Sequence, residues 1–201
     1  SEICIRDRYK TMTELELYKF HEETFKPIYA DLIAILGSKP EQIAFELEAA
    51  LSHIAVAKTN DELYEKNIEK AYGHLQRASL DAVKIMWLEY RQRAEKIILD
   101  PDMRAFASKA SESELVIKYQ KAELTAINAR KKELNNTGND PSASIPEYYK
   151  AAQLFSEIIS LIDPEKVTKL TRLKSKYKIK EVAISFLVGV ISSGFAALML
   201  A

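Results

Sequence analysis

Apolar residues recur every three or four positions through most of this chain, which is the spacing of an amphipathic α-helix. The clearest run lies between residues 41 and 58, where one predicted buried face comprises Ile43, Leu47, Ala50, Leu51, Ile54 and Ala57. The same spacing predicts helices over residues 12–36 with a break at Pro27, and over 62–99, 111–134 and 147–162. The chain has no convincing alternation typical of strands. The pattern therefore predicts an all-α helical bundle.

Turn-forming residues divide these helices. Gly37 is expected to end the first helix and Ser38 to cap the second, while the turn at residues 59–61 makes an antiparallel hairpin of helices 41–58 and 62–99. Residues 135–146, NNTGNDPSASIP, are expected to form a mobile surface loop. Asp163 is expected to cap a final helix. We divide the chain into a cytoplasmic helical bundle (1–163), a basic juxtamembrane helix (164–181) and a transmembrane helix (182–201).

The last of these segments is uncharged over 20 consecutive residues, 182–201. At about 1.5 Å per residue such a helix is about 30 Å long, which matches the hydrocarbon core of a bilayer. A buried core helix is the alternative, but a domain of this size rarely encloses a helix that is apolar on every face. The sequence therefore predicts a single C-terminal membrane span.

Basic residues directly precede this span: Arg172, Lys174, Lys176, Lys178 and Lys180. We call these five residues the basic collar. The positive-inside rule then predicts a single-pass protein of the inner or plasma membrane with a cytoplasmic N-terminal part. Anionic lipid is the expected partner of the collar. Direct nucleic-acid binding is the disfavoured alternative, because Tyr177 is the sole aromatic residue that accompanies these charges.

Small residues recur along one side of the predicted span. Small-xxx-small patterns let transmembrane helices approach closely, and serines can hydrogen-bond across the contact. This pattern predicts a homo-oligomer, or a narrow polar pore if several copies close into a ring. Chance is the alternative, since small residues are common in membrane helices. The predicted oligomerisation or pore face consists of Ser185, Gly189, Ser192, Ser193, Ala196 and Ala197.

Composition argues against most enzyme classes. Lys and Arg total 29, as do Asp and Glu, so the net charge of +0 gives no sign of a nucleic-acid partner. His21, His53 and His74 lie far apart in the sequence, and the chain has one cysteine and no HExxH motif. No metal site is therefore expected. The isolated glycines form no phosphate-binding loop, so no cofactor is expected and the chain is predicted not to be an enzyme.

The predicted hairpin nevertheless carries a polar ridge on its second helix, at Asn67, Lys70, His74, Arg77, Asp81 and Lys84. Antiparallel pairing about the turn near Asn60 places His53 opposite Asn67, and Glu46 opposite His74. Acid, imidazole and guanidinium groups would then converge. A solvated ridge held by ion pairs along one helix is the alternative interpretation.

The hairpin sequence ALSH followed by YEKNIEKAYGHLQRASLDAVK resembles the HEPN superfamily of helical bundles. Active members of that superfamily are ribonucleases that pair an Arg with a His further along the same helix, at a shared dimer cleft. Here no Arg precedes a histidine at the required distance, and Asn67 stands where that Arg would be relative to His74. An amide cannot supply the fixed positive charge that stabilises a phosphoryl transition state. The resemblance therefore implies a degenerate, non-catalytic HEPN-like domain.

A HEPN-like domain joined to one membrane span is also similar in architecture to small membrane accessory proteins of type VI-B CRISPR systems. This resemblance implies an oligomeric membrane pore in prokaryotic antiviral defence, with an RNA-guided effector protein as a partner. The alternatives are a tail-anchored scaffold and a membrane-tethered HEPN-type ribonuclease. In the ribonuclease His74 would be the general acid or base, Arg77 would bind phosphate, Glu46 or Asp81 would orient the imidazole, and Asn67 would join the site.

Overall fold

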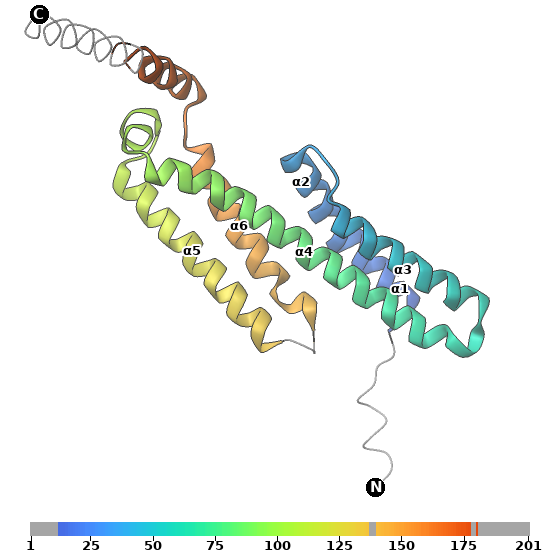
Figure 1. Cartoon of the computed structure of the whole chain (residues 1–201). Coiled ribbons are helices and arrows are strands. Elements are labelled where there is room, and N and C mark those ends of the chain that lie inside the picture. The colour runs from blue at the N-terminus through green and yellow to red at the C-terminus, as the bar shows by residue number, and fades with distance from the viewer. Residues whose placement is uncertain (1–11, 137–139, 178–179, 181–201) are drawn as a thin grey trace, which may run out of the picture.

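A computed structural model describes residues 12–136, 140–177 and 180 of the chain, and these residues form an all-α bundle (Figure 1). Helix α4 (Tyr64–Leu99) is its central element. Helices α1 and α3 flank the N-terminal half of α4, whereas α5 and α6 flank its C-terminal half. Residues of α4 accordingly enter all three apolar clusters of the core. The predicted all-α fold is confirmed.

The first predicted helix is continuous rather than broken at Pro27. It comprises α1 (Glu14–Phe20), a π-helical turn (His21–Phe25) and α2 (Lys26–Leu36). A proline in a helix lacks one donor and crowds the preceding turn. The wider π-helical turn directly before Pro27 accommodates this defect, so the predicted break is wrong. Gly37 ends α2 in the left-handed region at φ 69°, as expected.

Helix α3 (Glu41–Thr59) follows. Pro40 is its N-cap residue and no side chain caps the first turn, so the prediction of Ser38 as the cap is wrong. Asn60 accepts a hydrogen bond from the Glu62 backbone and starts a 3-10 turn (Asp61–Leu63) that leads into α4. The hairpin of α3 and α4 is as predicted (Figure 1). Leu51 is 66% exposed, contrary to prediction, because α3 buries mainly the narrower face of Ile43, Ala50 and Ala57.

The C-terminal half of the bundle begins after a π-helical segment (Met103–Ala107). Ser111 caps α5 (Glu112–Asn135) by accepting a hydrogen bond from the Glu114 backbone. A 3-10 turn (Pro141–Ser144) leads into α6 (Ile145–Ser160), which packs against both α4 and α5. Phe155 and Tyr148 of α6 are fully buried, and burial together with a hydrogen bond to Glu133 raises the pKa of Tyr148 to about 12.

The segment 135–146 was predicted to be a mobile surface loop, and part of it is packed instead. Gln76 of α4 donates hydrogen bonds to Asp140 at 3.0 Å and to Ser142 at 3.2 Å, and Ser144 is buried. These contacts anchor the turn that precedes α6. Residues 137–139 lie outside the described part of the chain.

A further helix, described over residues 164–177, leaves the bundle after an antiparallel bridge between Ser108 and Ile162 (Figure 1). Asp163 caps it, as predicted, by accepting from the Glu165 and Lys166 backbones. Lys174 contacts Asp100 and Asp102, each at 2.9 Å. The other described residues of the basic collar, Arg172, Lys176 and Lys180, are exposed.

The predicted membrane span and its small-residue face lie outside the described residues, as does Lys178 of the collar. Among the helices that the structure describes, none combines the length and the apolar character required to cross a bilayer.

Candidate functional site

The facing polar residues of the α3–α4 hairpin form one connected group, which we call the polar cluster: Glu46, His53, Asn67, His74 and Arg77. Helical periodicity places the first two on one face of α3 and the other three on one face of α4. Antiparallel packing then joins them. Both predicted pairs, His53 with Asn67 and Glu46 with His74, are confirmed.

Asn67 closes the end of the cluster nearest the turn. Its amide nitrogen donates to the Leu63 carbonyl at 2.9 Å, so its amide oxygen is left to accept from Nδ1–H of His53 at 2.8 Å. Only 6% of Asn67 is exposed. A buried amide with both ends satisfied is a fixed structural link. Asn67 therefore holds His53 in one tautomer.

Glu46 organises the other end. Its Oε2 atom lies 2.7 Å from Nδ1 of His74 and 3.2 Å from Nε of Arg77, while Nη2 of Arg77 lies 2.8 Å from the same imidazole nitrogen. One Nδ1 atom cannot both donate to the carboxylate and accept from the guanidinium. Because a carboxylate only accepts and the guanidinium only donates, we assign Nδ1–H of His74 as a donor to Glu46. The Nε2 atom of a neutral His74 is then an acceptor.

The two imidazoles connect these ends. The rings of His53 and His74 stack with centroids 5.2 Å apart and planes inclined by 25°. Beside them lies an open hollow of about 410 Å³ whose lining includes Lys70, Glu69 and Gly73 together with His53, His74 and Arg77. Lys70 and Arg77 are the groups in this lining that could bind an anion, and the Nε2 acceptor of His74 could accept a proton. Arg77, however, is already paired with Glu46, which reduces the positive charge that this hollow offers.

The remaining residues of the predicted ridge do not join the polar cluster. Asp81 accepts a hydrogen bond from Gln42 at 2.6 Å, and burial raises the pKa of its carboxyl group. Lys84 donates to Glu133 of α5 at 3.0 Å. Asp81 therefore does not orient the imidazole of His74, and Glu46 does. Asp81 still faces α3 but lies opposite Gln42, whereas Lys84 faces α5.

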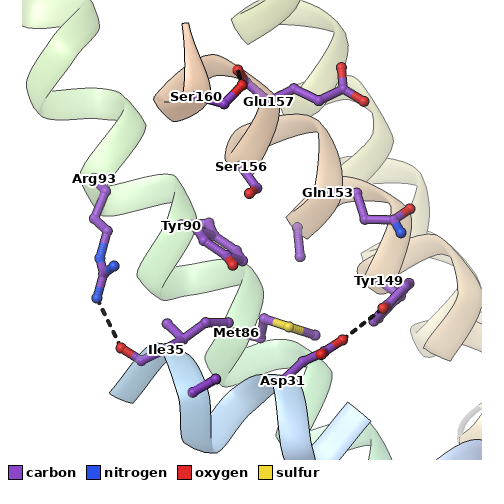
Figure 2. Close-up of a pocket in the computed structure, with 12 residues that line it drawn as sticks. Asp31, Ile35, Met86, Tyr90, Arg93, Tyr149, Gln153, Ser156, Glu157 and Ser160 are labelled. Carbon is purple, nitrogen blue, oxygen red and sulfur yellow. Dashed lines mark hydrogen bonds between the residues drawn. The ribbon is translucent and has the colours of Figure 1, made fainter. Parts of the chain in front are cut away.

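A second hollow, of about 740 Å³, lies between α2, α4 and α6 and was not predicted (Figure 2). Asp31 and Tyr149 join across one end through a hydrogen bond of 2.8 Å. At the other end Arg93 donates to the Ile35 carbonyl at the C-terminus of α2, at 3.2 Å. These contacts connect residues 118 and 58 positions apart, so no local sequence pattern could have indicated them. Their main effect is to hold α2 against α4 and α6.

No group of three or more His, Cys, Asp or Glu side chains within the described ranges is arranged to hold a metal ion. No protein-family model, curated protein sequence or solved structure matches this chain. The fold of the described residues defines the class only as an all-α domain of about seven helices.

Proposed function

We propose that this chain is a membrane-anchored homo-oligomer that acts as a pore-forming effector or accessory in prokaryotic antiviral defence of the CRISPR type. In this proposal residues 182–201 span the inner or plasma membrane and the cytoplasmic bundle is a HEPN-like domain that assembles copies without catalysing a reaction. An RNA-guided effector protein is the proposed partner. A tail-anchored scaffold for such a partner is the simpler alternative, and it differs in conducting no ions.

One observation carries the non-catalytic part of the proposal: His74 and Arg77 share a single carboxylate oxygen of Glu46. A guanidinium that is already neutralised by a carboxylate is a poor stabiliser of a phosphoryl transition state. Asn67 adds no charge and is buried with both ends of its amide satisfied. This arrangement supports a polar clasp that fixes α3 against α4 more than it supports a nuclease.

The membrane part of the proposal is supported by the uncharged run 182–201 and by the basic collar before it. The helix over 164–177 leaves the bundle, and its collar residues Arg172 and Lys176 are exposed, so their charges are available to anionic lipid (Figure 1). Lys174 instead contacts Asp100 and Asp102 and thereby links the collar to the bundle.

The decisive experiment is dye release from anionic vesicles that contain the full chain. We expect release by the wild type and a loss of at least tenfold for Gly189→Leu, since a bulky side chain would separate the close-packed helices. Ile191→Leu, within the same segment but off the small-residue face, is the matched control. Release by neither wild type nor control would leave the scaffold as the better interpretation, and release unaffected by Gly189→Leu would refute the proposed pore face.

The hollow of about 410 Å³ beside His74 favours a second candidate, the membrane-tethered ribonuclease. In that candidate Nε2 of His74 takes a proton, Glu46 fixes the imidazole and Lys70 or Arg77 contacts phosphate. The full chain should then cleave labelled RNA, and His74→Ala should lower the rate at least a hundredfold. His21→Ala is the control, because His21 lies on the π-helical turn and contacts the exposed Glu22. Equal cleavage by both variants would eliminate this candidate.

A further inference from the structure

Helix α5 is an outer helix of the bundle, and it is apolar on two sides. Its inner side buries Leu115, Ala122, Ala126 and Ala129 against the rest of the bundle, mainly α6. On the outer side Ile117, Leu124 and Leu134 are 61%, 61% and 60% exposed, and Ile127 is 46% exposed. Single exposed apolar residues are ordinary, whereas four aligned on one helix indicate a contact surface.

The spacing of these residues is that of a coiled-coil seam. Positions 117, 124 and 131 are seven apart, as are 120, 127 and 134, and the two sets alternate by three and four as heptad a and d positions do. Gln120 and Lys131 complete the sets and are exposed. We call the six residues the outer stripe: Ile117, Gln120, Leu124, Ile127, Lys131 and Leu134. The stripe extends about 26 Å along the helix.

The order of apolar and polar positions in the stripe is the same when it is read in reverse. In an antiparallel pair of helices an a position packs against a d position of the partner. Placing a second α5 antiparallel about a two-fold axis between residues 125 and 126 sets Ile117 against Leu134 of the second copy, and Leu124 against Ile127 of the second copy. The same register sets Gln120 against Lys131. Every apolar residue therefore meets an apolar residue, and the polar pair can form a hydrogen bond.

Charges beside the stripe agree with this register. Glu123 and Arg130 lie on the same flank of the stripe, seven residues apart. The two-fold axis brings Glu123 of one copy near Arg130 of the second copy, and the reverse pair likewise. Glu123 already accepts a hydrogen bond from Arg91 at 2.6 Å, and Arg130 contacts Glu133 at 3.2 Å. Each side chain is therefore already paired within its own copy, so this flank places no like charges together but adds little attraction. A lipid surface or an unrelated helix would not require a palindromic order of apolar and polar positions.

We infer that α5 is a homodimer interface, in which the outer stripes of two copies pack antiparallel about a two-fold axis. This inference deepens the homo-oligomer of the proposed function by assigning a cytoplasmic contact to it. It differs from the small-residue face of the predicted span, which is a separate contact in a separate segment. Two-fold contacts of this kind would join copies in pairs, whatever symmetry the span adopts.

Cysteine cross-linking of the full chain tests both the surface and the register. In a Cys4→Ser background, the double variant Ile117→Cys with Leu134→Cys should oxidise to a covalent dimer, because the two positions meet across the axis. Each single variant should remain largely monomeric on a denaturing gel, since residue 117 of one copy lies about 26 Å from residue 117 of the other. Equal cross-linking of the single variants would indicate parallel packing and overturn the inference, as would no cross-linking of the double variant.

A charge substitution supplies an independent measurement. Leu124→Glu should reduce cross-linking of the double variant at least tenfold, because two carboxylates would be buried at the centre of the interface. Leu51→Glu, at a residue 66% exposed on α3, is the matched control and should leave cross-linking unchanged. Equal effects of the two substitutions would overturn the inference. Dye release reports on the predicted span, so failure of the pore proposal leaves the cross-linking result interpretable.

Discussion

The two halves of the bundle are held together by different chemistry, although α4 passes through both. On the α3 side the buried residues are small or aliphatic, such as Ala50, Ala57 and Ile68. The rings packed against them, including Phe20 and Tyr72, are only partly buried, and the polar cluster lies beside them. On the α5–α6 side large rings fill the space: Phe155 is fully buried, and Tyr119 packs edge-on against it at 5.5 Å. Alanine-rich helix faces allow two helices to approach closely but bury little apolar area. Specific polar contacts therefore help to fix how α3 packs against α4.

The comparison implies that single side chains matter most where they fill volume. Phe155→Ala should lower the free energy of unfolding by about 3–5 kcal/mol, because it removes a buried ring and leaves a cavity. Phe45→Ala is the control, since Phe45 is 64% exposed, and its effect should stay within about 0.5 kcal/mol. Thermal unfolding of the full chain in mild detergent, followed by far-ultraviolet circular dichroism, measures both. Comparable losses would show that the buried ring of Phe155 stabilises the α5–α6 half no more than an exposed ring does.

Asn67 is the most buried member of the polar cluster, so its removal should have the next largest effect. Asn67→Ala leaves Nδ1–H of His53 without its acceptor and should cost about 1–3 kcal/mol. Lys66→Ala changes the adjacent exposed residue and should be nearly neutral. Hydrogen exchange should localise the loss to α3 and the first turns of α4. A loss spread equally over α5 and α6 would show that the two halves unfold as one unit.

A smaller effect is expected from Glu46→Gln, which keeps the shape of the side chain and removes its charge. The amide oxygen can still accept from His74, whereas the ion pair with Arg77 is lost. We expect a cost of about 0.5–1.5 kcal/mol from the same denaturation experiment. Glu48→Gln, at an exposed position on α3, is the matched control. If Glu46→Gln stabilised the protein, the cluster would be strained for function rather than serving as a clasp.

The smallest effect concerns the contact of Lys174 with Asp100 and Asp102. The hydrogen bond from Lys174, together with backbone donors, lowers the pKa of Asp100 below its ordinary value. A lowered carboxyl pKa stabilises the folded form above the unfolded pKa of about 4, and this stabilisation is lost as pH falls through the folded value. Acidification through that range should increase local opening of residues 164–177 by about two- to fivefold, measured as hydrogen exchange corrected for the intrinsic pH dependence of amide exchange. Lys174→Ala should show the increase at neutral pH and no further acid dependence.

Helical periodicity was sufficient to predict the α3–α4 pairing, including its register. Once the turn is placed near Asn60, positions equidistant from it must lie opposite, so His53 meets Asn67 and Glu46 meets His74. Capping was less predictable. Ser38 and Pro40 both suit a helix start, and the structure has Pro40 at the cap position. The π-helical turn before Pro27 was missed because the cost of a proline can be absorbed over several residues.

The sequence by itself determined the all-α class, the helix limits to within a few residues and the pairs that meet along one hairpin, because these depend on local spacing. Only the tertiary structure decided which charged side chains contact those pairs and which polar groups remain accessible. Glu46 holds both His74 and Arg77, while Asp81 pairs with Gln42, and no spacing rule distinguishes the two carboxylates. The exposure of the outer stripe on α5 also required the structure, since apolar residues on both sides of a helix do not reveal which side the bundle covers.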